Sequence, residues 1–142
     1  GGADPADDGG DAVEAAALVA SFEALVREAV EKAGRDRIVD RTGLGTATVE
    51  AAADGDAAGL TLEEGASVLA AAADRDADTV VAEVRDHLLM GMATAVLDVD
   101  TISTAIDADL TGQEVQQVLE GRAAMTLEQL AEVMAVIETR KP

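Results

Sequence analysis

Apolar residues recur every three or four positions along most of this chain, which is the spacing of a helix with one buried face. The first such stripe holds Leu18, Phe22, Leu25 and Ala29, and it predicts a helix that Gly34 ends. No stretch has the alternation of apolar and polar residues that indicates a strand. The pattern predicts an all-α fold of about eight helices, near residues 12–33, 36–42, 45–54, 62–73, 78–97, 100–108, 112–120 and 126–140.

Four sites carry the sequence signal of a helix start, an N-cap residue followed three positions later by Glu or Gln. The side chains of such a pair satisfy two backbone N–H groups that the first turn of a helix leaves without a partner. The pairs are Asp11 with Glu14, Thr61 with Glu64, Thr111 with Glu114, and Thr126 with Gln129. We therefore expect capping boxes at the start of four helices.

Part of the chain repeats after 66 residues, with one loop residue dropped along the way. The matched positions are helix starts, apolar positions and a helix-ending Gly. The matches are Leu44 with Leu110, Val49 with Val115, Gly55 with Gly121, and residues 60–64 with 125–129. They predict two similar helical halves, at about 35–73 and 100–140, joined by the helix near 78–97. The alternative is chance similarity between two alanine-rich helical segments.

The helix predicted near 78–97 is the most distinctive stretch of the chain. It holds the only histidine, His87, and carries no charge from residue 88 to residue 97. This run is about half of the roughly 20 residues that a membrane span needs, so we expect a buried central helix instead. His87 is interpreted as a packing residue. A chain this small covers an apolar helix with difficulty, which favours a homodimer; the candidate core or dimer residues are Leu88, Leu89, Met92 and Val96.

The charge balance changes the expected environment more than the expected fold. The chain has 29 acidic and 10 basic residues, a formal net charge of −19, yet 49% of its residues are hydrophobic. That apolar content predicts a single helical domain over residues 11–142, with the Gly- and Asp-rich residues 1–10 as a disordered tail. Carboxylates at this density repel one another unless salt screens them, and at about 1 M salt the screening length is about 3 Å. We therefore expect a cytoplasmic protein that works at high salt.

A short helix, a turn with Gly43 and Gly45, a second helix that stops at Gly55 and a capped third helix follow one another over about residues 35–72. This order resembles the lambda-repressor-like (Cro-type) helix-turn-helix family, and residues 101–137 resemble it more loosely as a second, degenerate copy. The resemblance implies a helix-turn-helix scaffold, whose second motif helix contacts bases in DNA-binding members. Residues 114–122 also look like a family of short acidic haloarchaeal proteins of unknown function, which implies no activity.

Two groups of residues would serve DNA binding on such a scaffold. The candidate base contacts, in the second copy, are Gln113, Gln116, Gln117 and Arg122. The candidate phosphate contacts, in the first copy, are Arg35, Arg37 and Arg41. Both groups lie among acidic residues that offer competing ion pairs, and phosphate affinity falls steeply as salt rises.

Other chemistry finds little support in the sequence. The absence of Cys excludes disulfides, thiolate zinc sites and cysteine nucleophiles. The run Asp74-x-Asp76-x-Asp78 begins like a calcium loop, but Thr79 stands where that loop needs Gly. We predict no enzyme activity, no cofactor, no metal site, no small-molecule substrate and no membrane span.

Two functions remain after these exclusions. The first is a non-enzymatic regulatory or adaptor protein that uses a helix-turn-helix scaffold for contacts with an unknown protein partner. The alternative is a sequence-specific DNA-binding transcription regulator that works at high salt. The first function predicts the candidate DNA contacts in local pairs and an exposed apolar patch elsewhere, whereas the second predicts them exposed on one convex surface.

Overall fold

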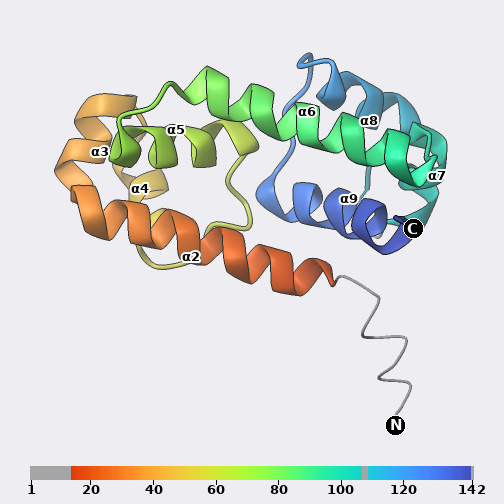
Figure 1. Ribbon diagram of the computed structural model, residues 1–142. Coiled ribbons are helices and arrows are strands. Elements are labelled where there is room, and N and C mark those ends of the chain that lie inside the picture. Colours follow the sequence, from red (N-terminus) through yellow and green to blue (C-terminus); the bar gives the residue numbers. More distant parts are fainter. Residues whose placement is uncertain (1–13, 107–108, 142) are drawn as a thin grey trace, which may run out of the picture.

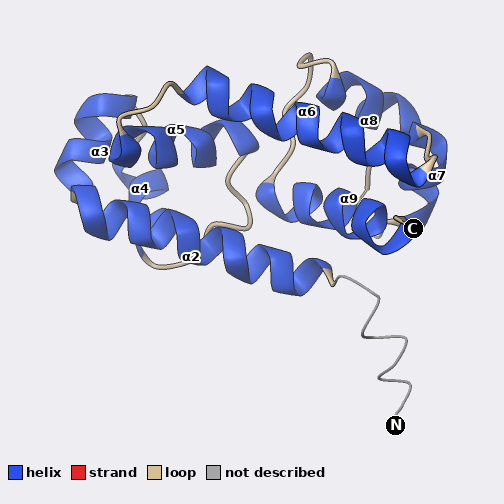
Figure 2. Cartoon of the chain, in the orientation of Figure 1, coloured by secondary structure: helices blue, strands red, loops and turns tan. Residues whose placement is uncertain are grey.

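The computed structural model describes residues 14–106 and 109–141, and every regular element within these ranges is a helix (Figure 2). The eight helices are α2 (Ala15–Ala33), α3 (Arg35–Thr42), α4 (Thr46–Ala53), α5 (Leu62–Ala73), α6 (Ala77–Ala95), α7 (Val99–Ala105), α8 (Gly112–Leu119) and α9 (Leu127–Arg140). They confirm the predicted all-α fold of eight helices. The predicted tail, residues 1–10, and the predicted cap at Asp11 lie outside the described residues.

The helices form two halves of four, α2 to α5 and α6 to α9, in which helices of similar length follow in the same order (Figure 1). Each half begins with a helix of 19 residues, α2 or α6, and continues with two short helices and a longer one. The helix predicted to join the halves is therefore the first helix of the second half. A single shift of 66 residues misses this match because the connections between helices differ in length.

The same positions are buried in both halves. Aliphatic residues with at most 6% exposure occupy them, and each contributes roughly 1.5–3 kcal/mol through burial. The matched pairs are Val26 with Leu88, Ile38 with Ile102, Val49 with Val115, Leu62 with Leu127, and Val68 with Val133. The repeat is thus a repeat of core positions as well as of helix boundaries.

The halves meet where each enters its last helix, in an isolated antiparallel β-bridge. The Leu62 N–H donates to the Met125 carbonyl and the Leu127 N–H donates to the Leu60 carbonyl, both at 2.8 Å. Met125 is the counterpart of Leu60, and Leu127 is the counterpart of Leu62. The two hydrogen bonds are therefore related by an approximate two-fold axis. Helix packing follows the same axis, since α2 packs on α9 while α6 packs on α5. Each half therefore completes the core of the other.

Three of the predicted capping boxes are confirmed, at Thr61, Thr111 and Thr126. In each, the Thr side chain accepts a hydrogen bond from a backbone N–H three residues on, and the Glu or Gln there accepts one from the Thr N–H. The helix-ending glycines of the repeat also match, because Gly55 has φ +77° and Gly121 has φ +78°. Gly adopts such angles without the strain of a side chain.

Helix α6 is buried on one face only. Val81, Leu88 and Gly91 are buried against the rest of the protein, with Leu88 only 1% exposed. On the other side Leu89 is 47% exposed and Met90 71% exposed. The expectation of a buried central helix therefore holds for one face of α6 only. Helices α5, α8 and α9 cover that face, and no element of the described residues covers the other.

Candidate functional site

An apolar groove lies between the two halves, and we call it the central groove. In Figure 1, α2 runs along one edge of the molecule and α6 along the other, with α5 and α9 between them. All four helices line the groove, whose volume is about 170 Å³. Helix α2 contributes Phe22, Leu25 and Val26, and α6 contributes Val80 and Val84. Phe22 is the only aromatic residue of the chain.

Small residues of α5 line the central groove. Gly65 and Ala66 lie in its lining and are both buried, beside Leu127 and Leu130 of α9. A Cβ atom on Gly65 would come within 3.2 Å of Leu127 Cδ1, so this Gly lets α5 and α9 approach closely. The counterpart of Gly65 in the second half is Leu130, which is 3% exposed. The two halves therefore differ in side-chain size at this point of the groove lining.

The residues at the edge of the central groove combine apolar and acidic character. Leu25 lines the groove and is nevertheless 52% exposed. Exposed glutamates lie within three positions of lining residues on all four helices; they are Glu28, Glu63, Glu83 and Glu128. The side chains of the two arginines next to lining residues of α2 and α6 lie beside helix-ending glycines, Arg27 beside Gly55 and Arg85 beside Gly121. Of these glutamates, Glu83 is paired with Arg75, whose Nη2 lies 3.0 Å from Glu83 Oε2. Exposed carboxylates therefore lie within three positions of the apolar lining on α2, α5 and α9 as well.

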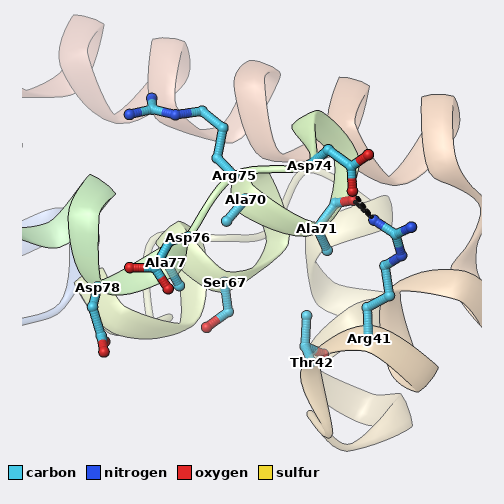
Figure 3. Close-up of a pocket in the computed structure, with 10 residues that line it drawn as sticks. All are labelled: Arg41, Thr42, Ser67, Ala70, Ala71, Asp74, Arg75, Asp76, Ala77 and Asp78. Atoms are coloured by element: carbon cyan, nitrogen blue, oxygen red, sulfur yellow. Dashed lines mark hydrogen bonds and ion pairs between the residues drawn. The ribbon is translucent and has the colours of Figure 1, made fainter.

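A second cleft, of about 480 Å³, lies between the end of α3 and the connection from α5 to α6 (Figure 3). Arg41 Nη1 donates to Asp74 Oδ1 at 2.7 Å and to the Ala71 carbonyl at 3.1 Å. The hydrogen bond and positive charge of Arg41 hold the pKa of Asp74 below its ordinary value. Asp76 instead accepts from the Thr79 N–H and hydroxyl at the start of α6. These acidic residues do not converge on one point, and the described residues hold no group of three metal-ligating side chains.

The candidate phosphate contacts lie at one end of the first half, and two of the three hold carboxylates. Arg35 Nε lies 3.1 Å from Glu50 Oε2, and Arg41 holds Asp74 as described above. Arg37 and Arg41 line one further cleft of about 310 Å³ together with Lys32. The structure therefore gathers these residues, but ion pairs occupy most of them.

The candidate base contacts lie on α8 and just after it, in the second half, and they are also paired locally. Gln116 Nε2 donates to Glu120 Oε2 at 2.9 Å, and Arg122 Nη2 lies 2.7 Å from Glu120 Oε1. The hydrogen bonds from Gln116 and Arg122 hold the pKa of Glu120 below its ordinary value. Gln113 is exposed and Gln117 is half-buried. Helices α8 and α3 lie at opposite ends of the molecule in Figure 1, so the two groups form no common surface.

The candidate core or dimer residues of α6 fall into two sets. Leu88 is buried and Met92 half-buried, whereas Leu89 and Val96 are exposed, Val96 by 88%. His87 does not pack as predicted, because its side chain is 58% exposed and lies 3.9 Å from Glu138. The outer face of α6, formed by Leu89 and Met90, is therefore a second apolar surface.

The sequence alone missed the central groove and its edge. One signal for it was present, because Gly65 is an isolated Gly inside a helical pattern, which often marks a close approach of two backbones. The pattern does not identify the helices that face α5 across the groove, because that arrangement depends on the two-fold packing of the halves.

Among the described residues, no single helix is long and apolar enough to cross a membrane. Helices α6 and α7 taken together meet the same criterion of length and composition, but they are bent by 93°.

Comparison with known proteins gives one match. The model of a family of unknown function, DUF5791, matches residues 18–140. No curated protein and no solved structure matches the chain. The match covers both halves and all but the first residues of α2, and it brings no helix-turn-helix relationship with it.

Proposed function

The chain belongs to DUF5791, a family of unknown function, and we propose that it is a non-enzymatic regulatory or adaptor protein that binds another protein. The central groove is the observation that carries this proposal. Its lining is apolar, its volume is about 170 Å³, and Leu25 at its edge is 52% exposed. A hydrophobic groove between helices is one of the recurring surfaces that bind a partner segment.

The candidate DNA contacts favour protein binding over DNA binding. Four of the seven hold carboxylates of this chain in hydrogen bonds or ion pairs. The two groups lie on different halves, at opposite ends of the molecule. Phosphate contacts also lose affinity steeply as salt rises, by about 10³–10⁵ between 50 and 200 mM salt for 6–10 contacts.

The scaffold and the environment are part of the proposal. The order α3, α4, α5 and its counterpart α7, α8, α9 supports two helix-turn-helix-like units that serve protein contacts. The net charge of −19 supports a cytoplasm at high salt, where mutual repulsion of the carboxylates is screened.

Photo-crosslinking in cells tests the proposed function. A photoreactive amino acid replaces Leu25, and the control carries it at Thr46, an exposed residue at the start of α4. We expect a discrete protein adduct from position 25 that position 46 does not give. Fluorescence anisotropy with genomic DNA fragments in 1–3 M KCl should show no binding. Saturable DNA binding, or equal adducts from both positions, would contradict the proposal.

We also propose that a second copy packs on the outer face of α6. Leu89 and Met90 support this, since two large apolar side chains stand exposed side by side on one helix. Light scattering in 2 M KCl should show a dimer that Met90→Glu converts to a monomer. A wild-type monomer under these conditions rules the dimer out.

A further inference from the structure

We propose that the central groove binds an amphipathic α-helix that carries basic residues beside its apolar stripe. This inference rests on the proposed function and adds the shape and the charge of the partner. The shape follows from the helices that form the groove, and the charge follows from its edge.

The lining of the central groove has the spacing of a helix contact. Along α5 the lining residues are Leu62, Gly65, Ala66 and Leu69, which recur at intervals of three and four. They form the stripe that one helix presents to another, and α2 and α6 flank it as they would flank an additional helix. An amphipathic helix lays its own apolar stripe into a groove of this kind.

The volume of the groove fits an anchoring side chain of that helix. The volume of about 170 Å³ is close to that of an apolar cavity, of about 150 Å³, that takes up a benzene molecule. One large apolar side chain is therefore of the right size for the space that Leu25, Phe22 and the other lining residues enclose. Buried anchors of this type supply most of the affinity of a protein interface.

The charge of the partner follows from the exposed glutamates at the edge. Glu28, Glu63 and Glu128 lie within three positions of lining residues on α2, α5 and α9, whereas Glu83 of α6 is paired with Arg75 of this chain. A second copy of this chain, with its net charge of −19, would bring like charges to this edge. Lysine or arginine residues on either side of the apolar stripe meet opposite charges instead.

A peptide with a single tryptophan tests the inference cleanly, because the chain contains no Trp and no Tyr. The probe is a helical peptide of about 14 residues with Leu on one stripe, Lys on the flanks and one Trp. Its matched control carries Glu at every Lys position. Trp emission is followed during titration with the full chain in 1 M and in 3 M KCl.

Two variants of the full chain locate the binding site. Leu25→Glu places a charge at the mouth of the central groove, and Thr46→Glu places one at the start of α4, outside the lining. Both residues are exposed, so neither substitution disturbs the core. Circular dichroism checks that both variants keep the wild-type helix content.

We expect the Leu/Lys peptide to bind the wild type and Thr46→Glu equally and to bind Leu25→Glu at least about tenfold more weakly. The Leu/Glu peptide should bind more weakly than the Leu/Lys peptide in 1 M KCl, with the difference shrinking in 3 M KCl. Equal binding to both variants, a preference for the Leu/Glu peptide, or no binding of either peptide would overturn the inference. If a protein adduct from position 25 persists in those cases, the proposed function stands and only this partner is wrong.

Discussion

The two halves of this protein share a core and differ at the surface where they meet. Ile38 and Ile102 occupy equivalent buried positions, and the caps at Thr61 and Thr126 have identical backbone angles. At the position of Gly65, however, the second half carries a leucine. Positions that define the fold are therefore alike in the two halves, while this position of the groove lining carries a small residue in one half and a large one in the other.

The ends of the halves differ in charge as well. Lys32, Arg35, Arg37 and Arg41 belong to the first half, and their counterparts in the second are Thr94, Val99, Thr101 and Ala105. The same fold forms around uncharged residues at these positions. The cations of the first half are therefore a property of that half and not a requirement of the helix arrangement.

The largest effect is expected from matched cavities in the two halves. Ile38→Ala and Ile102→Ala each remove a side chain that is 0% exposed, and each should lower the free energy of unfolding by about 3 kcal/mol. Because each half completes the core of the other, a single transition should persist in urea unfolding followed by circular dichroism at 2 M KCl. Separate transitions for the two halves would show that they fold independently.

A smaller, equal pair of losses is expected at the caps. Thr61→Ala and Thr126→Ala each remove the hydrogen bond to the N–H of the third helical residue, at a cost of about 1 kcal/mol. The same urea titration measures both. A loss of stability at only one of the two sites would contradict the two-fold equivalence of the two helix starts.

A gain of less than about 1 kcal/mol is expected from Val96→Gly. Val96 ends α6 at φ +54°, a left-handed conformation that a β-branched residue adopts only with strain. The first half has Gly34, at φ +87°, immediately after α2. Differential scanning calorimetry should show a higher Tm for the variant, whereas a lower Tm would mean that the exposed Val96 side chain makes a stabilising contact.

The smallest effects concern pH. The pKa of Asp74 lies below its ordinary value of 3.8 because Arg41 donates to it, and that of Glu120 lies below 4.5 because Gln116 and Arg122 donate to it. A carboxyl whose folded pKa is lowered stabilises the fold above its unfolded pKa, and this stability is lost as pH falls through the folded pKa. Asp74→Asn and Glu120→Gln should each flatten the decline of Tm below about pH 4.5. If Tm declines with falling pH in both variants as it does in the wild type, these hydrogen bonds to Asp74 and Glu120 do not stabilise the fold.

Local sequence signals predicted most of the fold. Each capping box within the described residues is formed, and Gly34, Gly43, Gly55 and Gly121 mark helix ends, because caps and left-handed turns depend on few neighbouring residues. The equivalence of α2 and α6 escaped prediction because the two helices share apolar positions rather than residue identities.

The candidate site was less accessible from sequence. A stripe such as Leu62, Gly65 and Leu69 shows that α5 has an apolar face, but not which helices meet it or whether they fill it. Likewise, the uncharged run of α6 gave no means of telling the buried Leu88 from the exposed Leu89. Both distinctions depend on packing between distant segments, and the groove exists only once the two halves are placed about their axis.

Methyl NMR of the full chain with the Leu/Lys peptide shows whether the groove between the halves binds a partner helix. We expect chemical-shift changes to concentrate on the methyl groups of Leu25, Leu62, Leu69, Leu127 and Leu130, which line the groove. The methyl groups of Leu89, on the outer face of α6, should stay unchanged. Shifts centred on Leu89, with the groove leucines unmoved, would contradict this expectation.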